Sequence, residues 1–248
     1  MAKITRLFLL GIILIVSASA CSGEQSTPQA TTQLEIINLQ TTPALEHWLE
    51  DVAGCAADIP DFAVTTQILP LSELDLEQAN LILRLGERQE DDPYVSVMGV
   101  ENLVVLAGSE VPVDSLSQNV VQRIFTGEIT NWSEVPEVQN AGIEINQPIL
   151  TLSYPEGHEL RLLFQKAYLE DETLGDEPQI FSTETYLEEL LVTHAYALGY
   201  TLESLKATNV QTLAIRGFDE ALAQQPVLAV TADEPSGELR QLLLCLQN

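Results

Sequence analysis

Basic residues are scarce in this 248-residue chain, which has 10 lysines and arginines against 37 aspartates and glutamates. The formal net charge of −27 excludes a surface built to attract nucleic acid or anionic lipid headgroups. A small anionic ligand is not excluded, because a cleft lined by backbone N–H groups is locally positive even in an acidic protein. We therefore expect no nucleic-acid partner and a small-molecule ligand at most.

Histidines and reactive motifs are also few. His47, His158 and His194 are scattered, and neither a His-x-x-x-His pair nor a Cys-x-x-Cys motif occurs. His47 lies one helical turn or less from Glu46 and Glu50, which is more typical of a surface charge pair than of a metal site. A Gly-x-Ser-x-Gly elbow, a P-loop and a dinucleotide fingerprint are all missing from the sequence. The sequence thus predicts no metal, no cofactor and no enzymatic activity, with a hydrolase or transferase as the weakest alternative.

The longest apolar run lies at the start of the chain, over residues 7–16, and is too short to span a bilayer comfortably. A positive segment precedes it and Ala18-Ser19-Ala20-Cys21 follows it, which indicates a lipoprotein signal peptide over residues 1–20. Acyl chains on Cys21 would anchor the protein, since each buried methylene adds about 0.8 kcal/mol. A plain secretory signal ending in Ala-x-Ala is the alternative. We expect an exported cell-envelope lipoprotein on the outer face of a membrane.

Residues 21–33 are rich in Ser, Thr, Gln and Pro and show no apolar periodicity, as expected of a flexible linker. The rest of the chain, residues 34–248, is long enough for one large domain or two lobes of about 100 residues each. Lipidation of Cys21 leaves Cys55 and Cys245, and an even pair in an exported domain argues for a disulfide. Two buried free thiols are the alternative.

Strand-like and helix-like segments alternate along residues 34–248. Strand patterns cover residues 34–39, 62–68, 81–85, 94–97, 103–106, 145–152, 197–200, 210–215 and 227–230. Helical patterns cover residues 116–124 and 186–194, a stretch around Leu160, Leu163 and Phe164, and the C-terminal segment. Another helix begins at Thr42-Pro43, with Thr42 as N-cap and Pro43 at the first helical position. This order predicts an α/β protein with mostly parallel sheets covered on both faces.

A short helical pattern runs into the string Ile124-Phe125-Thr126-Gly127-Glu128-Ile129-Thr130-Asn131-Trp132. Gly127 provides a positive φ after the helix, and Trp132 is a large apolar anchor beside a polar turn. Spacing alone fits a helix-ending turn capped by a buried aromatic. The string itself resembles the "IFtGeitnW" segment of the phosphate-binding-protein-like family, the type II periplasmic solute-binding proteins of phosphate ABC transporters. The chain resembles a divergent member of this family, and three further segments match it: Val104-Val105-Leu106, Pro148-Ile149 and Leu198-Gly199-Tyr200.

The resemblance implies a two-lobed type II periplasmic-binding-protein fold with a hinge. Lobe one is expected over residues 34–106 and 208–248, with both Cys55 and Cys245 in it, and lobe two over residues 107–207. The implied function is that of a monomeric, lipid-anchored solute-binding protein that passes a small ligand to an ABC permease. The alternative is a degenerate solute-binding fold that acts as an envelope sensor or protein-interaction module without transport.

The resemblance also places the ligand between a loop after the first strand and a loop opening the lobe-two helix. The residues expected to line it are Gln40, Thr41, Thr42, Arg84, Tyr154, Gly157, His158, Glu159 and Arg161. Gly157 keeps its place, but the family's Ser-Gly-Thr is His158-Glu159-Leu160 in this chain. Carboxylates facing a phosphate are repulsive, so phosphate specificity is not expected.

Two arginines, Arg84 and Arg161, come one from each expected lobe. Together they would clamp a carboxylate bidentately as the lobes close. The alternative is that each arginine pairs with a neighbouring acid, Glu87 or Glu159.

Overall fold

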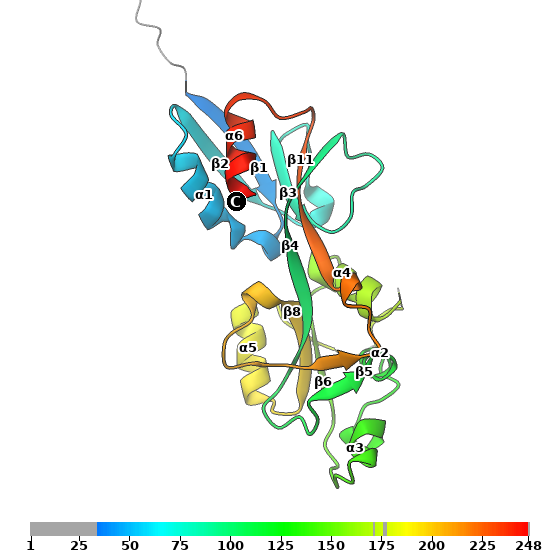
Figure 1. The fold of residues 1–248 in the computed structure, drawn as a ribbon. Helices are drawn as coiled ribbons and strands as arrows, with labels where there is room; N and C mark the ends of the chain where they lie inside the picture. Colours follow the sequence, from blue (N-terminus) through cyan, green and yellow to red (C-terminus); the bar gives the residue numbers. More distant parts are fainter. Residues whose placement is uncertain (1–33, 171, 176–177, 248) are drawn as a thin grey trace, which may run out of the picture. The chain divides into compact units, whose positions relative to one another are not determined.

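The computed structural model describes residues 34–170, 172–175 and 178–247. The expected signal peptide, the lipidated Cys21 and the linker lie outside the described residues. In the described part, a nine-stranded sheet has the order β2-β1-β3-β11-β4-β8-β6-β7, with β9 paired to β4, and β10 and β5 form a second sheet. Helices pack along these strands (Figure 1).

The strands are β1 (Glu35–Thr41), β2 (Phe62–Ile68), β3 (Leu81–Leu85), β4 (Tyr94–Ala107), β5 (Ser115–Ser117), β6 (Leu150–Ser153), β7 (Gln179–Ile180), β8 (Ala197–Leu202), β9 (Gln211–Thr212), β10 (Ala214–Arg216) and β11 (Gln224–Thr231). The α-helices are α1 (Trp48–Ala57), α2 (Gln118–Phe125), α3 (Pro136–Asn140), α4 (Glu159–Tyr168), α5 (Glu184–Thr193) and α6 (Gly237–Leu246). Short 3₁₀ helices are η1 (Pro43–Leu45), η2 (Leu71–Glu73), η3 (Trp132–Glu134), η4 (Glu203–Leu205) and η5 (Glu220–Leu222).

Parallel pairs join β1 to β2 and β3, β6 to β7 and β8, and β10 to β5. The long strands β4 and β11 run antiparallel to their neighbours. The predicted α/β class is therefore confirmed. The predicted strands at residues 62–68 and 81–85 coincide with β2 and β3.

Strand β4 connects two lobes. Its residues 94–102 pair with β11, whereas its residues 103–107 pair with β8 (Figure 1). Two separate strands were predicted here, over residues 94–97 and 103–106, where the structure has one strand of 14 residues. Gly99 is needed where it stands, since a Cβ there would lie 2.9 Å from the Trp48 ring.

Strand pairing supports a proposal for where the chain returns to lobe one. Strand β10 pairs with β5, and β9 pairs with the last residues of β4, so residues 211–216 join strands of the second lobe. Backbone pairing with β4 on the lobe-one side resumes at Gln224. We propose lobe boundaries on this basis: residues 34–102 and 224–248 for lobe one, and residues 103–223 for lobe two.

Two other predicted segments were wrong at their ends. Residues 145–149 were expected in a strand, but the strand β6 begins at Leu150. The Gln147 carbonyl accepts from the Trp132 amide at 2.9 Å, and the Ile149 amide donates to the Thr130 carbonyl at 2.8 Å. This segment therefore pairs with the turn before η3.

Leu116 was expected in a helix but lies in β5, because β10 supplies a partner from far along the chain.

The apolar residues of the string that ends at Trp132 are buried in the hydrophobic core. Gly127 has a φ of 84°, as expected for the residue that reverses the chain after α2. Trp132 is fully buried, and its Nε1 donates to the Tyr196 carbonyl at 3.0 Å. Phe164 stacks on Tyr200 with ring centroids 3.8 Å apart. The predicted aromatic anchor is confirmed.

Cys55 of α1 and Cys245 of α6 form a disulfide, with Cα atoms 5.8 Å apart and a sequence separation of 190. The predicted pairing is confirmed, and both helices lie in the same lobe (Figure 1). On the chain-entropy model, a crosslink closing so long a loop stabilises the fold by about 5 kcal/mol. Among the described residues, no helix has the length and apolar character needed to cross a membrane.

Candidate functional site

The end of β1 presents three buried polar side chains, of which one points across to the other lobe. The Gln40 amide bonds within lobe one, accepting from the Asp75 amide at 2.8 Å. Thr41 Oγ1 donates to the Leu83 carbonyl of β3 at 3.0 Å. Only the Thr42 hydroxyl crosses, donating to Glu159 Oε2 at 2.5 Å. Of the three side chains in the loop predicted to meet the ligand, only that of Thr42 donates a hydrogen bond to the other lobe.

Thr42 holds the N-cap position of η1 with an extended backbone, and Pro43 follows at the first position, as predicted. Its side chain makes no capping bond, however. The hydroxyl is used by Glu159 instead, so a residue type typical of a helix cap serves as a donor between the lobes.

Glu159, the first residue of α4, is the other half of this contact and is only 3% exposed. Its Oε2 accepts from the Thr42 hydroxyl and its Oε1 accepts from the Leu85 amide at 3.0 Å. Burial raises the pKa of Glu159 to about 7, although Thr42, Leu85 and the charge of Arg84 act in the opposite direction. A carboxyl in the first turn of a helix also lies at the favourable end of the helix dipole.

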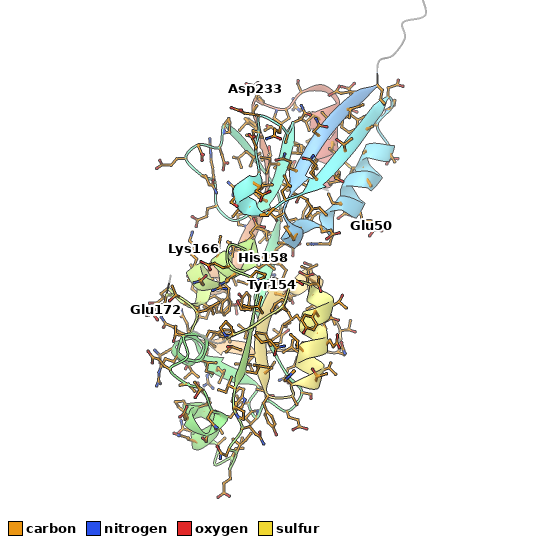
Figure 2. The ribbon with its side chains drawn as sticks, turned by 180° about the vertical axis from the view of Figure 1, so that it is seen from behind. Glu50, Tyr154, His158, Lys166, Glu172 and Asp233 are labelled. Carbon is orange, nitrogen blue, oxygen red and sulfur yellow. A yellow bond between two sulfur atoms is a disulfide. The ribbon has the colours of Figure 1, made fainter. Side chains whose placement is uncertain are left out.

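His158 precedes Glu159 and caps α4, its Nδ1 accepting from the Leu160 amide at 3.3 Å. The ring stacks on Tyr154, with centroids 4.3 Å apart and planes inclined by 15° (Figure 2). Burial lowers the pKa of His158 to about 4, so the ring is neutral at pH 7. Gly157 has a φ of 79° and completes the turn that positions this cap.

Tyr154 is fully buried, and its hydroxyl lies 2.9 Å from Thr201 Oγ1 and 3.2 Å from Glu184 Oε1. Burial raises the pKa of Tyr154 well above its ordinary value, with a further contribution from the charge of Glu184. The ring also packs against Phe181 and Tyr200. Tyr154 therefore supports the start of α4 from within the aromatic core.

The two predicted arginines are engaged elsewhere. Arg84 is 5% exposed, pairs with Asp92, and donates to the carbonyls of Leu85 and Glu87 at 3.2 and 3.0 Å. It lines a cavity of about 460 Å³ between β3 and the loop before β4. Arg161 donates to the Tyr154 carbonyl at 3.3 Å. The arginine clamp stays a prediction.

The structure therefore brings together Thr42, Glu159 and one group that the sequence analysis missed, the Leu85 amide. A backbone N–H has no sequence signature of its own. The available signal was position, because parallel strands end with unpaired donors and Leu85 is the last residue of β3.

A second polar cluster lies where α1, β4 and η4 meet. His47 Nε2 lies 3.0 Å from Glu101 Oε1, and Trp48 Nε1 and Ser204 Oγ donate to the same carboxylate. The predicted surface pairing of His47 with Glu46 or Glu50 is thus replaced by a contact across the fold. Burial raises the pKa of Glu101, but these three partners outweigh burial and leave it below the ordinary value.

This cluster does not have the geometry of a catalytic triad. A triad places the carboxylate and the hydroxyl on opposite ring nitrogens of the histidine. Here both Glu101 and Ser204 approach Nε2 of His47, and Nδ1 is buried without a hydrogen-bond partner. In the residues that the structure describes, no group of three or more His, Cys, Asp and Glu is arranged to hold a metal ion.

Two lobes joined by β4, with a buried contact at the ends of β1 and β3 and the start of α4, make a two-lobed periplasmic-binding-protein fold, which solved structures share. A family model described as "PBP superfamily domain" matches residues 16–242, and the chain belongs to this family. No curated protein matches the chain.

Solved structures agree on the fold. A putative phosphate ABC transporter substrate-binding protein with bound phosphate from Clostridium perfringens is 16% identical, with a TM-score of 0.70 over 86% of this chain and 93% of that one. An ABC-type phosphate transport receptor from Vibrio cholerae is 14% identical, with a TM-score of 0.68 over the same shares. The effector-binding domain of QuiR in complex with shikimate is 14% identical, with a TM-score of 0.55 over 86% of this chain and 95% of that one. The predicted family and two-lobed fold are confirmed.

Proposed function

We propose that this protein is a lipid-anchored, extracytoplasmic solute-binding protein that passes a small ligand to an ABC permease. The observation that carries the proposal is a buried contact between the lobes. The Glu159 carboxyl at the start of α4 accepts hydrogen bonds from Thr42, which follows β1, and from Leu85 at the end of β3. In α/β folds ligands bind where parallel strands end and helices begin, because backbone donors are free there. Membership of a family of binding proteins supports the same function.

The ligand that we propose is small and anionic, and it is not phosphate. The phosphate-containing relative shows that the fold accommodates phosphate, and the shikimate complex shows that it accommodates a carboxylic acid. With Glu159 in place a phosphate dianion would be repelled, and with Glu159 displaced it would meet two donors, from Thr42 and Leu85, which match the two oxygens of a carboxylate better than the four of a phosphate. We also propose that the protein acts as a monomer and that Cys21 carries the lipid, for which the sequence pattern is the support.

Native mass spectrometry of gently purified protein tests this function. The wild type is expected to carry an additional small mass, which Thr42→Val should lose and Thr42→Ser should retain, since only serine keeps the hydroxyl. Calorimetry with inorganic phosphate near neutral pH should give no saturable heat at micromolar concentrations. Submicromolar phosphate binding would contradict the ligand class that we propose.

One observation favours a second function, that of an envelope sensor or interaction module without transport. Glu159 already satisfies both donors that face the other lobe, as a fold without a ligand would require. The absence of any co-purified mass, together with no binding to a panel of small acids, sugars and amino acids, would favour this alternative.

A further inference from the structure

We propose, on the basis of the solute-binding function above, that Glu159 is a tethered ligand: its carboxylate fills a carboxylate site made by the Thr42 hydroxyl and the Leu85 amide, and a free carboxylate of the size of acetate can replace it. The ligand class of the protein is then a carboxylic acid, and binding requires Glu159 to leave.

The geometry of the contact is that of a bound ligand. Each carboxyl oxygen receives one donor, at 2.5 Å from Thr42 Oγ1 and at 3.0 Å from the Leu85 nitrogen. Both donors belong to lobe one, and they are separated from Glu159 by 117 and 74 residues of sequence. Glu159 is only 3% exposed, so water has little access to these donors.

The surroundings favour a carboxylate over a larger oxyanion. Two donors match the two oxygens of a planar carboxylate. The side chains of Thr41 and Gln40, at the end of β1, add no further donor because they form hydrogen bonds within lobe one. The charged and titratable groups nearby are Arg84, whose charge lowers the pKa of Glu159, and the neutral His158 ring. Arg84 is itself paired with Asp92, so it acts on the Glu159 carboxyl through its charge and not through a hydrogen bond.

The alternative is that Glu159 is a structural connection between the lobes. The two roles differ in one respect: a tethered ligand is replaceable by its untethered counterpart, whereas a structural connection is not. Glu159→Ala removes a methylene and a carboxylate, which is the size of an acetate ion. Alanine has a high intrinsic helix propensity, so the backbone of α4 accepts it at the first position, although the favourable interaction of the carboxylate with the helix dipole is lost.

The experiment compares thermal unfolding of the wild type and Glu159→Ala in sodium acetate and in sodium chloride of equal ionic strength, at pH 7.5. Acetate should bind the variant with half-saturation between about 0.1 and 10 mM, since so few atoms cannot bind much more tightly. At 100 mM the melting temperature of the variant should rise by roughly 3–15 °C more than in chloride. The wild type should show no acetate-specific change, because the tethered carboxyl of Glu159 outcompetes free acetate at this concentration.

The double variant Thr42→Val with Glu159→Ala is the matched control, and it should lose most of the acetate effect. An equal response of the wild type and Glu159→Ala to acetate, or no acetate-specific response of Glu159→Ala, would overturn the proposal. Should Glu159→Ala be unfolded in chloride, acetate must refold it, as followed by circular dichroism, and failure to do so also overturns the proposal. Acetate rescue without any natural solute in the wild type would retain the carboxylate site and count against the transport function alone.

Discussion

Glu159 should make the stability of this protein fall as the pH rises from acid to neutral. Its folded-state pKa of about 7 lies above the ordinary value of 4.5, because the carboxyl is buried. A group with a raised folded-state pKa contributes stability that is fully present below the unfolded-state value and is lost as the pH passes the folded-state value. The window is therefore pH 4.5 to about 7.

The magnitude follows from the same two values. The gap between them corresponds to about 3 kcal/mol of unfolding free energy between pH 4.5 and pH 8. The variant that isolates this contribution is Glu159→Gln, whose amide has the same shape, accepts from the Leu85 amide and donates to the Thr42 hydroxyl without ionising. His158, whose pKa is lowered to about 4, acts in the opposite direction in both proteins and cancels in the difference.

Urea denaturation followed by circular dichroism at several pH values is the assay. The difference in unfolding free energy between Glu159→Gln and the wild type should shift by about 2–4 kcal/mol in favour of Glu159→Gln between pH 4.5 and pH 8. Thr42→Ser, which keeps the hydroxyl, should follow the wild type. A pH-independent difference would show that Glu159 titrates normally in the folded protein, and the burial argument would then be refuted.

Three further predictions concern the anchors of the fold and of the chain. Cys55→Ser with Cys245→Ser should lower the unfolding free energy by about 5 kcal/mol in urea titrations, and a loss below about 1 kcal/mol would mean that the crosslink closes no constraining loop. Trp132→Ala should cost about 3–5 kcal/mol and Trp132→Phe distinctly less, since phenylalanine keeps most of the packing and loses the bond to Tyr196; equal losses would contradict the packing account. Cys21→Ala should move the protein from the membrane to the soluble fraction, and wild-type protein without an acyl mass would disprove lipidation.

Local patterns predicted the elements whose partners are near or whose composition is uniform. Strands β2 and β3 have the predicted bounds because one is rich in β-branched residues and the other is apolar except for Arg84. Strand β4 was missed as a single element because its pairing with β11, which continues past Gly99, depends on residues more than a hundred positions away. Leu116 was assigned to a helix for the same reason, since its partner strand β10 lies about a hundred residues further on.

The site was predictable only as far as its loops. The resemblance indicated the neighbourhoods of Thr42 and Glu159, and the structure joins these residues directly. Sequence could not show that Glu159 would accept from Leu85, because a backbone amide looks the same at every position. It also assigned Arg84 to the ligand, although Asp92, eight residues further on, is the acid that it pairs with.

The junction between the lobes is a hydrogen-bonded ribbon and not a pair of loose loops. Strand β4 passes from one lobe to the other without interruption, and β11 begins beside it, with Asn102 opposite Gln224. The Leu103 amide donates to the Ala223 carbonyl at 2.9 Å, so the two crossings are fastened together at the point where both change lobes. A two-stranded ribbon bends about its flat face far more readily than it shears in its own plane, because shear breaks ladder bonds. The junction therefore bends easily in one direction and resists movement in the others. Release of Glu159 would allow the lobes to move in that one direction.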